Sequence, residues 1–260
     1  MNLTNLFDVS GKVAIVTGGS RGIGEMIAEG LVANGVRTYI TARKADACDA
    51  TAARLSEIGE CISLPADMAT AEGIAAFVDA FSEREDKLHI LVNNAGAAWG
   101  APLGEFPEMG FDKILDINVK APYMLTQALL APLTAAATQE DPARVIMTGS
   151  IDGIKVPVGD NFSYSASKAG VHMLARHMAK FMIDRNITVN CIAPGPFESK
   201  MMAYMLEDER IRASIEETNP RGRIGSPEDV AGTVIWLSSR AGAYINGVTV
   251  PVDGGISMLA

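Results

Sequence analysis

Tyr164 and Lys168 stand four positions apart in a stretch, residues 163–184, that we predict to be helical. At this spacing both side chains project from one face of a helix. A free tyrosine has a pKa of about 10, and a lysine ammonium one turn away favours the phenolate and lowers that value. Such a tyrosine could donate a proton to a carbonyl oxygen or remove one from an alcohol. A lone Tyr-x-x-x-Lys pair is more often a solvated helix face, so the interpretation depends on the surrounding motifs.

A glycine-rich loop follows the first apolar run of the chain, residues 12–17. Gly18, Gly22 and Gly24 would permit a tight turn and let the backbone approach a pyrophosphate seated on the N-terminus of the next helix. The spacing G-x-x-x-G-x-G is not the commonest dinucleotide fingerprint, and a sharp turn without a ligand is the alternative. A triphosphate P-loop is excluded because the ending G-K-[ST] is missing.

The end of the second predicted strand, residues 36–41, indicates which dinucleotide would bind. An NAD site places an acidic residue there to accept from the ribose hydroxyls, but the strand ends in Thr41-Ala42-Arg43-Lys44, which contains no Asp or Glu. Arg43 could contact a 2′-phosphate, and Arg21 in the glycine loop could close on the same group. We therefore expect NADP(H) rather than NAD(H). After the third strand, Asp67 could accept from the adenine amino group or could cap the following helix.

The elements that must position these groups alternate between apolar strands and helices. Uninterrupted apolar strands are typical of a parallel sheet covered on both faces, and successive βαβ units build a doubly wound sheet with ligands at its carboxyl edge. We predict an α/β fold with a doubly wound parallel (Rossmann) sheet in a single domain, residues 1–260. The predicted strands are 12–17, 36–41, 61–66, 88–93, 144–148, 188–192 and 248–252. The predicted helices are 22–34, 45–58, 71–84, 111–134 and 163–184.

Composition and charge exclude several classes of function. The formal net charge of −9 argues against a nucleic-acid partner, which needs a basic face. No apolar run approaches the roughly 20 residues of a membrane span, and the N-terminus lacks a signal-like apolar core, so we expect no membrane partner. The three cysteines are widely spaced, which favours a cytoplasmic location with reduced thiols. The three histidines are scattered, so we expect no catalytic metal.

Several motifs occur in the order found in the short-chain dehydrogenases/reductases, and the chain resembles this family over nearly its whole length. The motifs are the glycine loop at 17–24, Asn-Asn-Ala-Gly at 93–96, Asn118, Ser150, Tyr164 with Lys168, and Pro194-Gly195. Within the family, residues 42–43, 54–61, 150–154 and 241–244 resemble the β-ketoacyl reductase group, in particular its members associated with bacterial rhamnolipid synthesis.

The resemblance implies catalytic roles for Asn118, Ser150, Tyr164 and Lys168. Tyr164 would exchange the proton, Ser150 would hydrogen-bond the substrate oxygen, and Lys168 would hold the nicotinamide ribose. Asn118 would complete a water-linked proton path to Lys168. Tyr164 and Lys168 would thus also contact the cofactor. The other expected NADP(H) contacts are Gly18, Ser20, Arg21, Gly22, Ile23, Gly24, Arg43, Asp67, Met68, Asn94, Ala95, Gly96, Pro194, Gly195, Phe197 and Ser199.

The substrate side of the expected site is apolar. Residues 198–220 resemble the mobile substrate lid of the family. The apolar residues of this segment would either pack against the domain or form a pliable cover for a substrate; they are Met201, Met202, Met205 and Leu206. Further apolar residues could form the wall of the site, and these are Trp99, Ile151, Val156, Val158 and Phe162. Such surroundings favour a ketone or acyl chain over a sugar.

Two positions depart from the β-ketoacyl reductases that accept substrate from acyl carrier protein. That group docks the carrier on two arginines, and the matching positions here are Ala131 and Lys180. An acidic carrier would also meet a chain of net charge −9. Both features argue against acyl carrier protein as a partner, and leave a free ketone, a CoA thioester or another secondary alcohol open. By resemblance, the helices around 118–134 and 163–184 would form the interface of a homotetramer.

We favour an NADP(H)-dependent enzyme that interconverts a ketone and a secondary alcohol, with an apolar 3-oxoacyl-type ketone as the substrate class. One alternative is a dehydrogenase of a steroid-like or cyclic secondary alcohol. A second alternative, from another class, is a cofactor-sensing protein without turnover. Proteins of that kind typically lack the tyrosine or the lysine, and both Tyr164 and Lys168 are present here.

Overall fold

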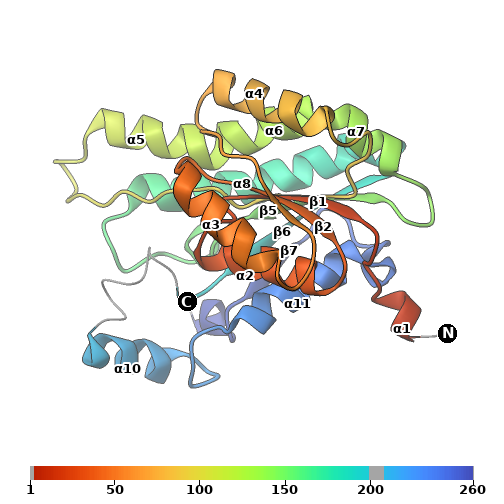
Figure 1. The fold of residues 1–260 in the computed structure, drawn as a ribbon. Helices are drawn as coiled ribbons and strands as arrows, with labels where there is room; N and C mark the ends of the chain where they lie inside the picture. The colour runs from red at the N-terminus through yellow and green to blue at the C-terminus, as the bar shows by residue number, and fades with distance from the viewer. Residues whose placement is uncertain (1–2, 199–207, 260) are drawn as a thin grey trace.

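The computed structural model describes residues 3–198 and 208–259 of the chain, and Figure 1 shows their arrangement. Seven strands form one parallel sheet in the order β3-β2-β1-β4-β5-β6-β7. Because β1 lies beside both β2 and β4, the chain winds outward from the middle of the sheet in two directions. The predicted doubly wound parallel sheet is therefore confirmed. The strands are β1 (Val13–Thr17), β2 (Arg37–Thr41), β3 (Cys61–Ser63), β4 (Ile90–Asn93), β5 (Ala143–Thr148), β6 (Ile187–Pro194) and β7 (Thr249–Val252).

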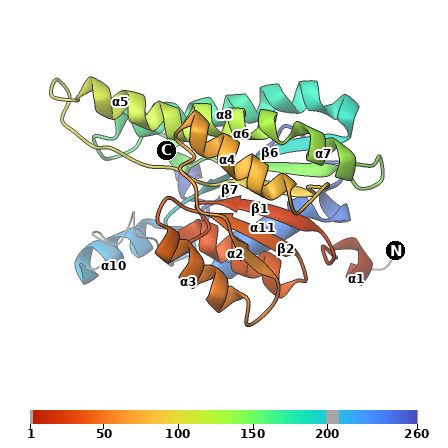
Figure 2. The same cartoon turned by 45° about the horizontal axis from the view of Figure 1, so that its top comes forward.

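Helices cover both faces of the sheet, with α2, α3 and α11 on one face and α4 to α8 on the other (Figures 1 and 2). The helices are α1 (Leu3–Leu6), α2 (Gly22–Ala33), α3 (Ala45–Leu55), α4 (Ala71–Ser82), α5 (Glu108–Leu115), α6 (Ala121–Ala128), α7 (Leu130–Ala136), α8 (Phe162–Met182), α10 (Glu209–Thr218) and α11 (Pro227–Ser238). Shorter helical segments are η1 (Asp116–Lys120), η2 (Ile151–Gly153), η3 (Ile183–Arg185), η4 (Arg240–Gly242) and η5 (Ile256–Leu259).

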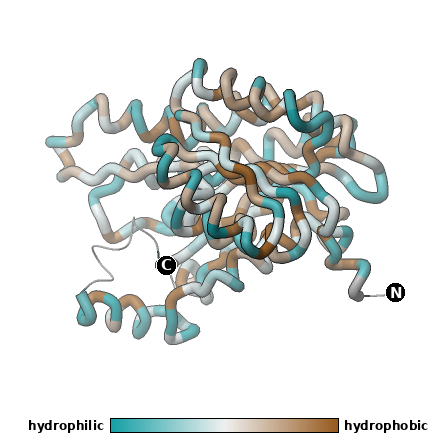
Figure 3. Tube along the Cα trace, viewed as in Figure 1, coloured by the Kyte–Doolittle hydropathy of each residue, from teal (hydrophilic) through white to brown (hydrophobic). Residues whose placement is uncertain are grey.

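The hydrophobic core has two parts, one on each face of the sheet. Ile15 of β1 packs in the part that contains Phe77 of α4 and Val171 of α8. Its neighbour Val16 points to the other face, in the part that contains Leu31 of α2. Both strand residues are fully buried, which explains why the strand is continuously apolar rather than alternating. Figure 3 shows hydrophobic residues concentrated along these central strands.

The single helix predicted over residues 111–134 is wrong in detail, because this region is divided into α5, η1, α6 and α7. In the π-helical turn η1, the backbone N–H of Ala121 donates to the carbonyl of Asp116, five residues earlier. Pro122 and Pro132 both lack a backbone N–H and cannot make the regular helical bond at their positions. The π turn matters for function because it carries Asn118.

Helices α10 and α11 were not predicted. Helix α11 begins with a capping box in which the Ser226 and Asp229 side chains bond each other's backbone, with Pro227 at the first helical position, a recognisable start signal. It packs closely on α2, since a methyl group at Gly30 would lie 2.5 Å from Cβ of Ala231. The sequence therefore contained a signal for α11.

Candidate active site

The carboxyl edge of the sheet brings together three of the four predicted catalytic side chains. Ser150 lies two residues beyond the end of β5 and precedes the 3-10 segment η2. Tyr164 and Lys168 lie on the first two turns of α8. The Ser150 hydroxyl is close enough to the Tyr164 phenol to lower its pKa. A strand end and a helix start thus meet at the group that would exchange a proton.

Lys168 is buried beneath the tyrosine. Its Nζ donates to the backbone carbonyl of Thr148, the last residue of β5, at 2.7 Å, and lies 5.5 Å from the ring centroid of Tyr164. Burial lowers the pKa of Lys168 to about 8, because an apolar environment disfavours the charged ammonium. The lysine is thereby held in a fixed place by the strand rather than by an acidic partner.

The electrostatics of Tyr164 differ from our expectation. We predicted that Lys168 lowers the pKa of the phenol, but burial raises the pKa of Tyr164 to about 12, and the Asp152 carboxylate adds to this rise. The neighbouring Ser150 hydroxyl acts in the opposite direction without cancelling the effect of burial. The phenol is therefore a firmly protonated group in this structure, which suits a proton donor better than a base.

Asn118 braces a different part of the site. Its Oδ1 accepts from the backbone N–H of Ala97, and its Nδ2 donates both to the carbonyl of Ala97 and to Ser167 Oγ, each at 2.9 Å. Ser167 immediately precedes Lys168 on α8. A methyl group at Gly96 would lie 3.0 Å from Asn118 Oδ1 and 3.7 Å from Lys168 Nζ. Asn118 therefore joins the loop after β4 to the helix that carries Tyr164 and Lys168.

The glycine loop and the Asn-Asn-Ala-Gly segment, about seventy residues apart in the sequence, are in direct contact. The backbone N–H groups of Asn94 and Ala95 both donate to Thr17 Oγ1 at 2.9 Å, and Asn94 Nδ2 donates to the Thr17 carbonyl at 2.9 Å. Gly18 has φ +67°, and a methyl group at Gly24 would collide with the Gly18 carbonyl. Gly18 is thus required because of its positive φ, and Gly24 is required because a side chain there would not fit.

The loop presents a helix N-terminus and two arginines to the same edge. Helix α2 begins at Gly22 and includes Ile23 and Gly24, and its N-cap residue, Arg21, makes no side-chain capping bond. Arg21 and Arg43 are exposed, and Ser20, which directly precedes Arg21, is half-buried. Among the described residues, neither arginine forms an ion pair.

Asp67 does not cap the following helix. The N-cap of α4 is Thr70, whose Oγ1 accepts from the backbone N–H of Gly73 at 3.0 Å. The carboxylate of Asp67 instead accepts from the N–H of Ala69 at 3.0 Å. The capping alternative for Asp67 is therefore wrong, while Met68 beside it is buried in the core.

The loop after β6 has a rigid start. Pro194 ends the strand, and the Gly195 N–H donates to the carbonyl of Val252 in β7 at 3.0 Å. The ring of Phe197 is buried against Gly225, where a methyl group would collide with it. Phe197 therefore presents backbone rather than its ring to the site. Ser199 lies outside the described residues.

The predicted apolar wall has mixed surroundings. Ile151 is buried directly after Ser150, and a methyl group at Gly110 would lie 3.0 Å from the ring of Trp99. Phe162 is partly exposed, whereas Val156 and Val158 are exposed, Val156 by 87%.

The predicted lid is described only in part. Its apolar residues Met201, Met202, Met205 and Leu206 lie outside the described residues. The part that is described includes α10, whose Arg212 pairs with Glu198 at 2.5 Å and with Glu216 at 3.3 Å. Beyond α10, Asn219 Nδ2 donates to the carbonyl of Asp253 at 3.0 Å, so this segment ends on the loop after β7.

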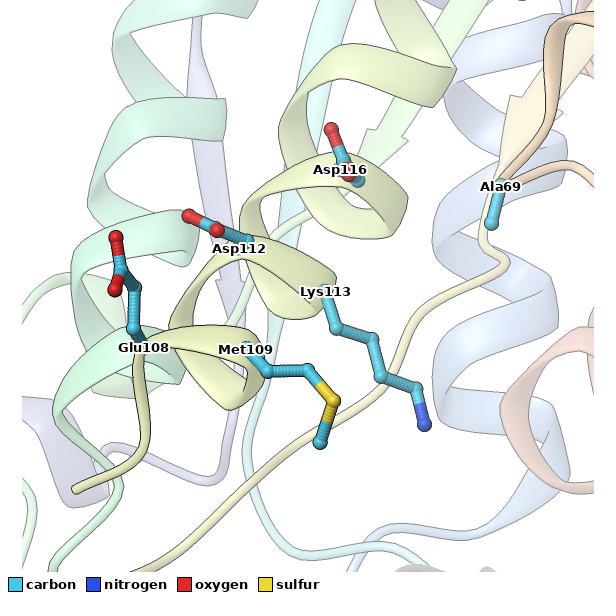
Figure 4. A pocket seen from close by; sticks show the side chains of 6 residues that line it. All are labelled: Ala69, Glu108, Met109, Asp112, Lys113 and Asp116. Atoms are coloured by element: carbon cyan, nitrogen blue, oxygen red, sulfur yellow. The ribbon is translucent and has the colours of Figure 1, made fainter. Parts of the chain in front are cut away.

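A hollow of about 500 Å³ lies away from the predicted catalytic group, along α5 (Figure 4). The figure shows side chains of α5 on one side and Ala69, which follows β3, on the other. Its lining residues are Ala69, Glu108, Met109, Asp112, Lys113 and Asp116. Three carboxylates and one lysine make this hollow polar, and none of the four predicted catalytic residues lines it.

Three residues near the site were not predicted. Thr17 ties the glycine loop to the loop after β4, Thr148 holds Lys168, and His172 contacts the backbone of Ser150. Thr17 and Thr148 both end strands, and His172 lies four residues after Lys168 on the same helix face. The place of each residue at a strand end or on the helix face could be predicted from the sequence. The contacts that each residue makes could not, because they form only in the folded chain.

Among residues 3–198 and 208–259, no cluster of three or more His, Cys, Asp or Glu side chains is arranged to hold a metal ion. In the same part of the chain, no helix combines the length and the apolar character needed to cross a bilayer.

Comparisons with known proteins agree with the geometry. A family model described as Enoyl-(Acyl carrier protein) reductase matches residues 18–257. The chain is 43% identical, over 97% of its length and 98% of the relative, to the rhamnolipids biosynthesis 3-oxoacyl-[acyl-carrier-protein] reductase of Pseudomonas aeruginosa. It is 34% identical, with the same two coverages, to the 2-dehydro-3-deoxy-D-gluconate 5-dehydrogenase of Escherichia coli.

Among solved structures, the Pseudomonas aeruginosa RhlG/NADP active-site complex superimposes with a TM-score of 0.95 at 42% identity, covering 99% of this chain and 100% of that one. The glycine loop, the Asn-Asn-Ala-Gly segment and the Tyr164–Lys168 pair lie at the sheet edge expected for a dinucleotide enzyme. The resemblance inferred from the motifs is confirmed: the chain belongs to the short-chain dehydrogenase/reductase family.

Proposed function

We propose that this chain is an NADP(H)-dependent oxidoreductase that interconverts a ketone and a secondary alcohol. The observation that carries the proposal is the placement of Tyr164 over the buried Lys168, whose Nζ lies 5.5 Å from the tyrosine ring centroid and 2.7 Å from the Thr148 carbonyl, two residues before Ser150. Tyr164 donates the proton to the carbonyl oxygen during reduction and recovers it during oxidation. Ser150 orients that oxygen, and its hydroxyl stabilises the negative charge that develops there.

The glycine loop fits NADP(H). Gly18 and Gly24 leave room where side chains would block the backbone, and the first turn of α2 has N–H groups free of side-chain caps, as a pyrophosphate requires. Arg21 and Arg43 are exposed beside the loop and suit a 2′-phosphate. When bound, the dinucleotide supplies the hydride. The NADP complex of the structural relative supports this assignment.

The remaining cofactor contacts follow from position. The backbone of Asn94, Ala95 and Gly96 lines the approach to Lys168, whose ammonium would hold the nicotinamide ribose. Asn94 acts mainly through its bonds to the glycine loop. Asn118 fixes the loop and the helix around that ribose and completes the proton path to Lys168. Asp67, Met68, Pro194, Gly195, Phe197 and Ser199 complete the proposed contacts.

The proposed substrate is an apolar ketone of the 3-oxoacyl type. The name of the Pseudomonas relative supports this class, whereas the Escherichia coli relative acts on a sugar acid by its name. Ala131 and Lys180 are exposed here, so the surface lacks the two arginines expected for acyl carrier protein. We therefore propose a free or CoA-linked acyl substrate rather than a carrier-bound one.

The wider assembly is also a proposal. Residues 1–260 form one domain, with 198–220 as the lid. Exposed apolar side chains on α6 and α8 support a homotetramer built through these helices; they include Tyr123, Met124, Met173 and Phe181. The three cysteines are free and buried, which supports a reducing, cytoplasmic compartment.

A substrate screen that follows loss of NADPH absorbance tests the proposal. Oxoacyl-CoA thioesters, free ketones, sugar-acid ketones and carrier thioesters are compared, with cyclic and steroid-like alcohols in the oxidative direction. We expect turnover with NADPH and an apolar ketone, and a lower KM for the carrier thioester in the variant A131R/K180R. Tight NADPH binding without turnover on any substrate would favour the cofactor-sensing alternative.

A further inference from the structure

His172 occupies a gap in the backbone of the turn that carries Ser150. The turn runs from Gly149 to Gly153, and its two terminal residues are glycines. A methyl group at Gly149 would collide with His172 Nε2, and one at Gly153 would lie 2.8 Å from His172 Cε1. The imidazole therefore fits between the two ends of the turn, in space that only glycine leaves open at both positions.

The ring also bonds the start of this turn. The backbone N–H of Ser150 donates to His172 Nε2 at 3.4 Å, and the backbone of Gly153, at the other end, is close enough to the ring to act on its pKa. Because Nε2 accepts, the ring proton must be on Nδ1. The bond to Ser150 therefore requires a neutral imidazole in the Nδ1–H tautomer.

We infer that His172 is a positioning residue that sets the backbone of the Ser150 turn, and with it the Ser150 hydroxyl beside Tyr164, and that only its neutral form does so. The inference rests on the proposed function, since it assigns its importance to the role of Ser150. His172 acts on Ser150 through the backbone of the turn. A protonated ring has no acceptor for the Ser150 N–H, so acid would release one end of the turn.

Burial and a neighbouring charge keep the ring neutral near pH 7. Burial lowers the pKa of His172, and the ammonium of Lys168, one turn earlier on α8, lowers it further. Cys191 of β6 also lies beside Gly149, and burial raises the pKa of its thiol to about 12, so it adds no charge. Asp152 is an acidic group inside the turn; burial raises its pKa, while Asn161 donates to its carboxylate at 3.0 Å.

The competing explanation is simple packing, in which any ring of similar size would serve. His172→Phe keeps a ring but removes the acceptor for the Ser150 N–H, whereas His172→Gln keeps an acceptor and a donor. His177, five residues later on α8, is exposed, so His177→Phe is the matched control. Asp152→Asn separates the titration of the carboxylate from that of the imidazole.

The test measures kcat, KM, the NADPH Kd and the pH profile of ketone reduction. For His172→Phe we expect kcat to fall about tenfold, NADPH Kd to change less than about twofold, and the loss of rate on acidification to disappear. His172→Gln restores most of kcat, His177→Phe resembles the parent, and Asp152→Asn retains the acid loss. Parental kcat and pH profile in His172→Phe, or equal weakening of kcat and NADPH binding with a lowered Tm, would overturn the inference.

A second measurement does not depend on turnover. Nitrogen-15 NMR of the histidine-labelled protein, with the His172 signals assigned by their absence in His172→Phe, reports the tautomer directly. We expect Nδ1–H with Nε2 as acceptor, and a titration midpoint below the ordinary histidine value. An Nε2–H tautomer would contradict the inference even in an active enzyme. If the parent protein lacks turnover but shows the expected tautomer, the proposed function fails while the contact itself stands.

Discussion

The Nζ atom of Lys168 lies 2.7 Å from the backbone carbonyl oxygen of Thr148. This one bond ties helix α8 to the end of strand β5, two residues before Ser150. The lysine, the serine and the tyrosine are therefore held by one frame of strand and helix rather than by flexible loops. Precise placement of this kind is what converts ordinary side chains into a proton-transfer group.

Replacing Arg43 with alanine should weaken NADPH binding much more than NADH binding. The guanidinium is exposed at the end of β2, where a charge-assisted bond to a 2′-phosphate would contribute about 1.5–3 kcal/mol. We expect the NADPH Kd to rise roughly 10- to 100-fold, with the NADH Kd nearly unchanged, as measured by titration of cofactor fluorescence. Arg185→Ala, at another exposed arginine, is the control. Equal weakening of both cofactors would remove the 2′-phosphate contact from the account.

Replacing Lys168 with methionine should stabilise the fold while removing activity. Burial lowers the pKa of Lys168 from 10.5 to about 8. Below about pH 8 the folded chain therefore contains a buried ammonium, which destabilises the folded state relative to the unfolded state. Lys168→Met should raise the free energy of unfolding by about 1–3 kcal/mol at pH 7. This advantage should shrink as the pH rises from about 8 to 10.5, where the lysine becomes neutral in both states. Denaturant titrations across that window test the sign, with Lys180→Met as the exposed control.

Asp141 should stabilise the opposite edge of the sheet. Its carboxylate accepts from Lys12 Nζ at 2.7 Å and from Arg144 Nη2 at 3.1 Å, and both cations also donate to carbonyls at the end of α11. Asp141→Asn leaves two largely buried cations without a counter-charge, which should lower the free energy of unfolding by about 2 kcal/mol, since Asp141 is itself about one third exposed. Thermal unfolding should show a lower Tm than the exposed control Asp86→Asn. A fall in activity per folded molecule would contradict the purely structural role.

The strands and the family were predictable because their signals are local. Ile15 and Val16 face opposite cores, so the strand reads as a continuous apolar run. The motif residues follow the carboxyl ends of strands, where parallel sheets bind their ligands. The start of helix α11 was also predictable, because Ser226 is its N-cap residue and Pro227 is its first residue. The π turn around Asn118 was not predictable from periodicity, because its hydrogen bonds span five residues where those of an α-helix span four.

The electrostatics of the site depend on burial, which no local pattern gives. Tyr164 and Lys168 were found by spacing, yet the pKa of the tyrosine moves upward because the fold encloses it. The ammonium, which we expected to oppose this rise, is engaged by the Thr148 carbonyl. The contact of His172 with the Ser150 turn could not be predicted from the sequence, because Gly149 and Gly153 lie beside the ring only once the turn is folded.

The most direct test of the account is Tyr164→Phe, measured in parallel for cofactor binding and for turnover. Loss of the phenol removes the proton donor but leaves the glycine loop and the arginines intact. We predict an NADPH Kd within about twofold of the parent and a kcat reduced by roughly 10²–10⁴, while Tyr123→Phe, on the exposed face of α6, retains parental kcat. A Tyr164→Phe protein that reduces ketone at the parental rate would contradict the claim that this phenol transfers the proton.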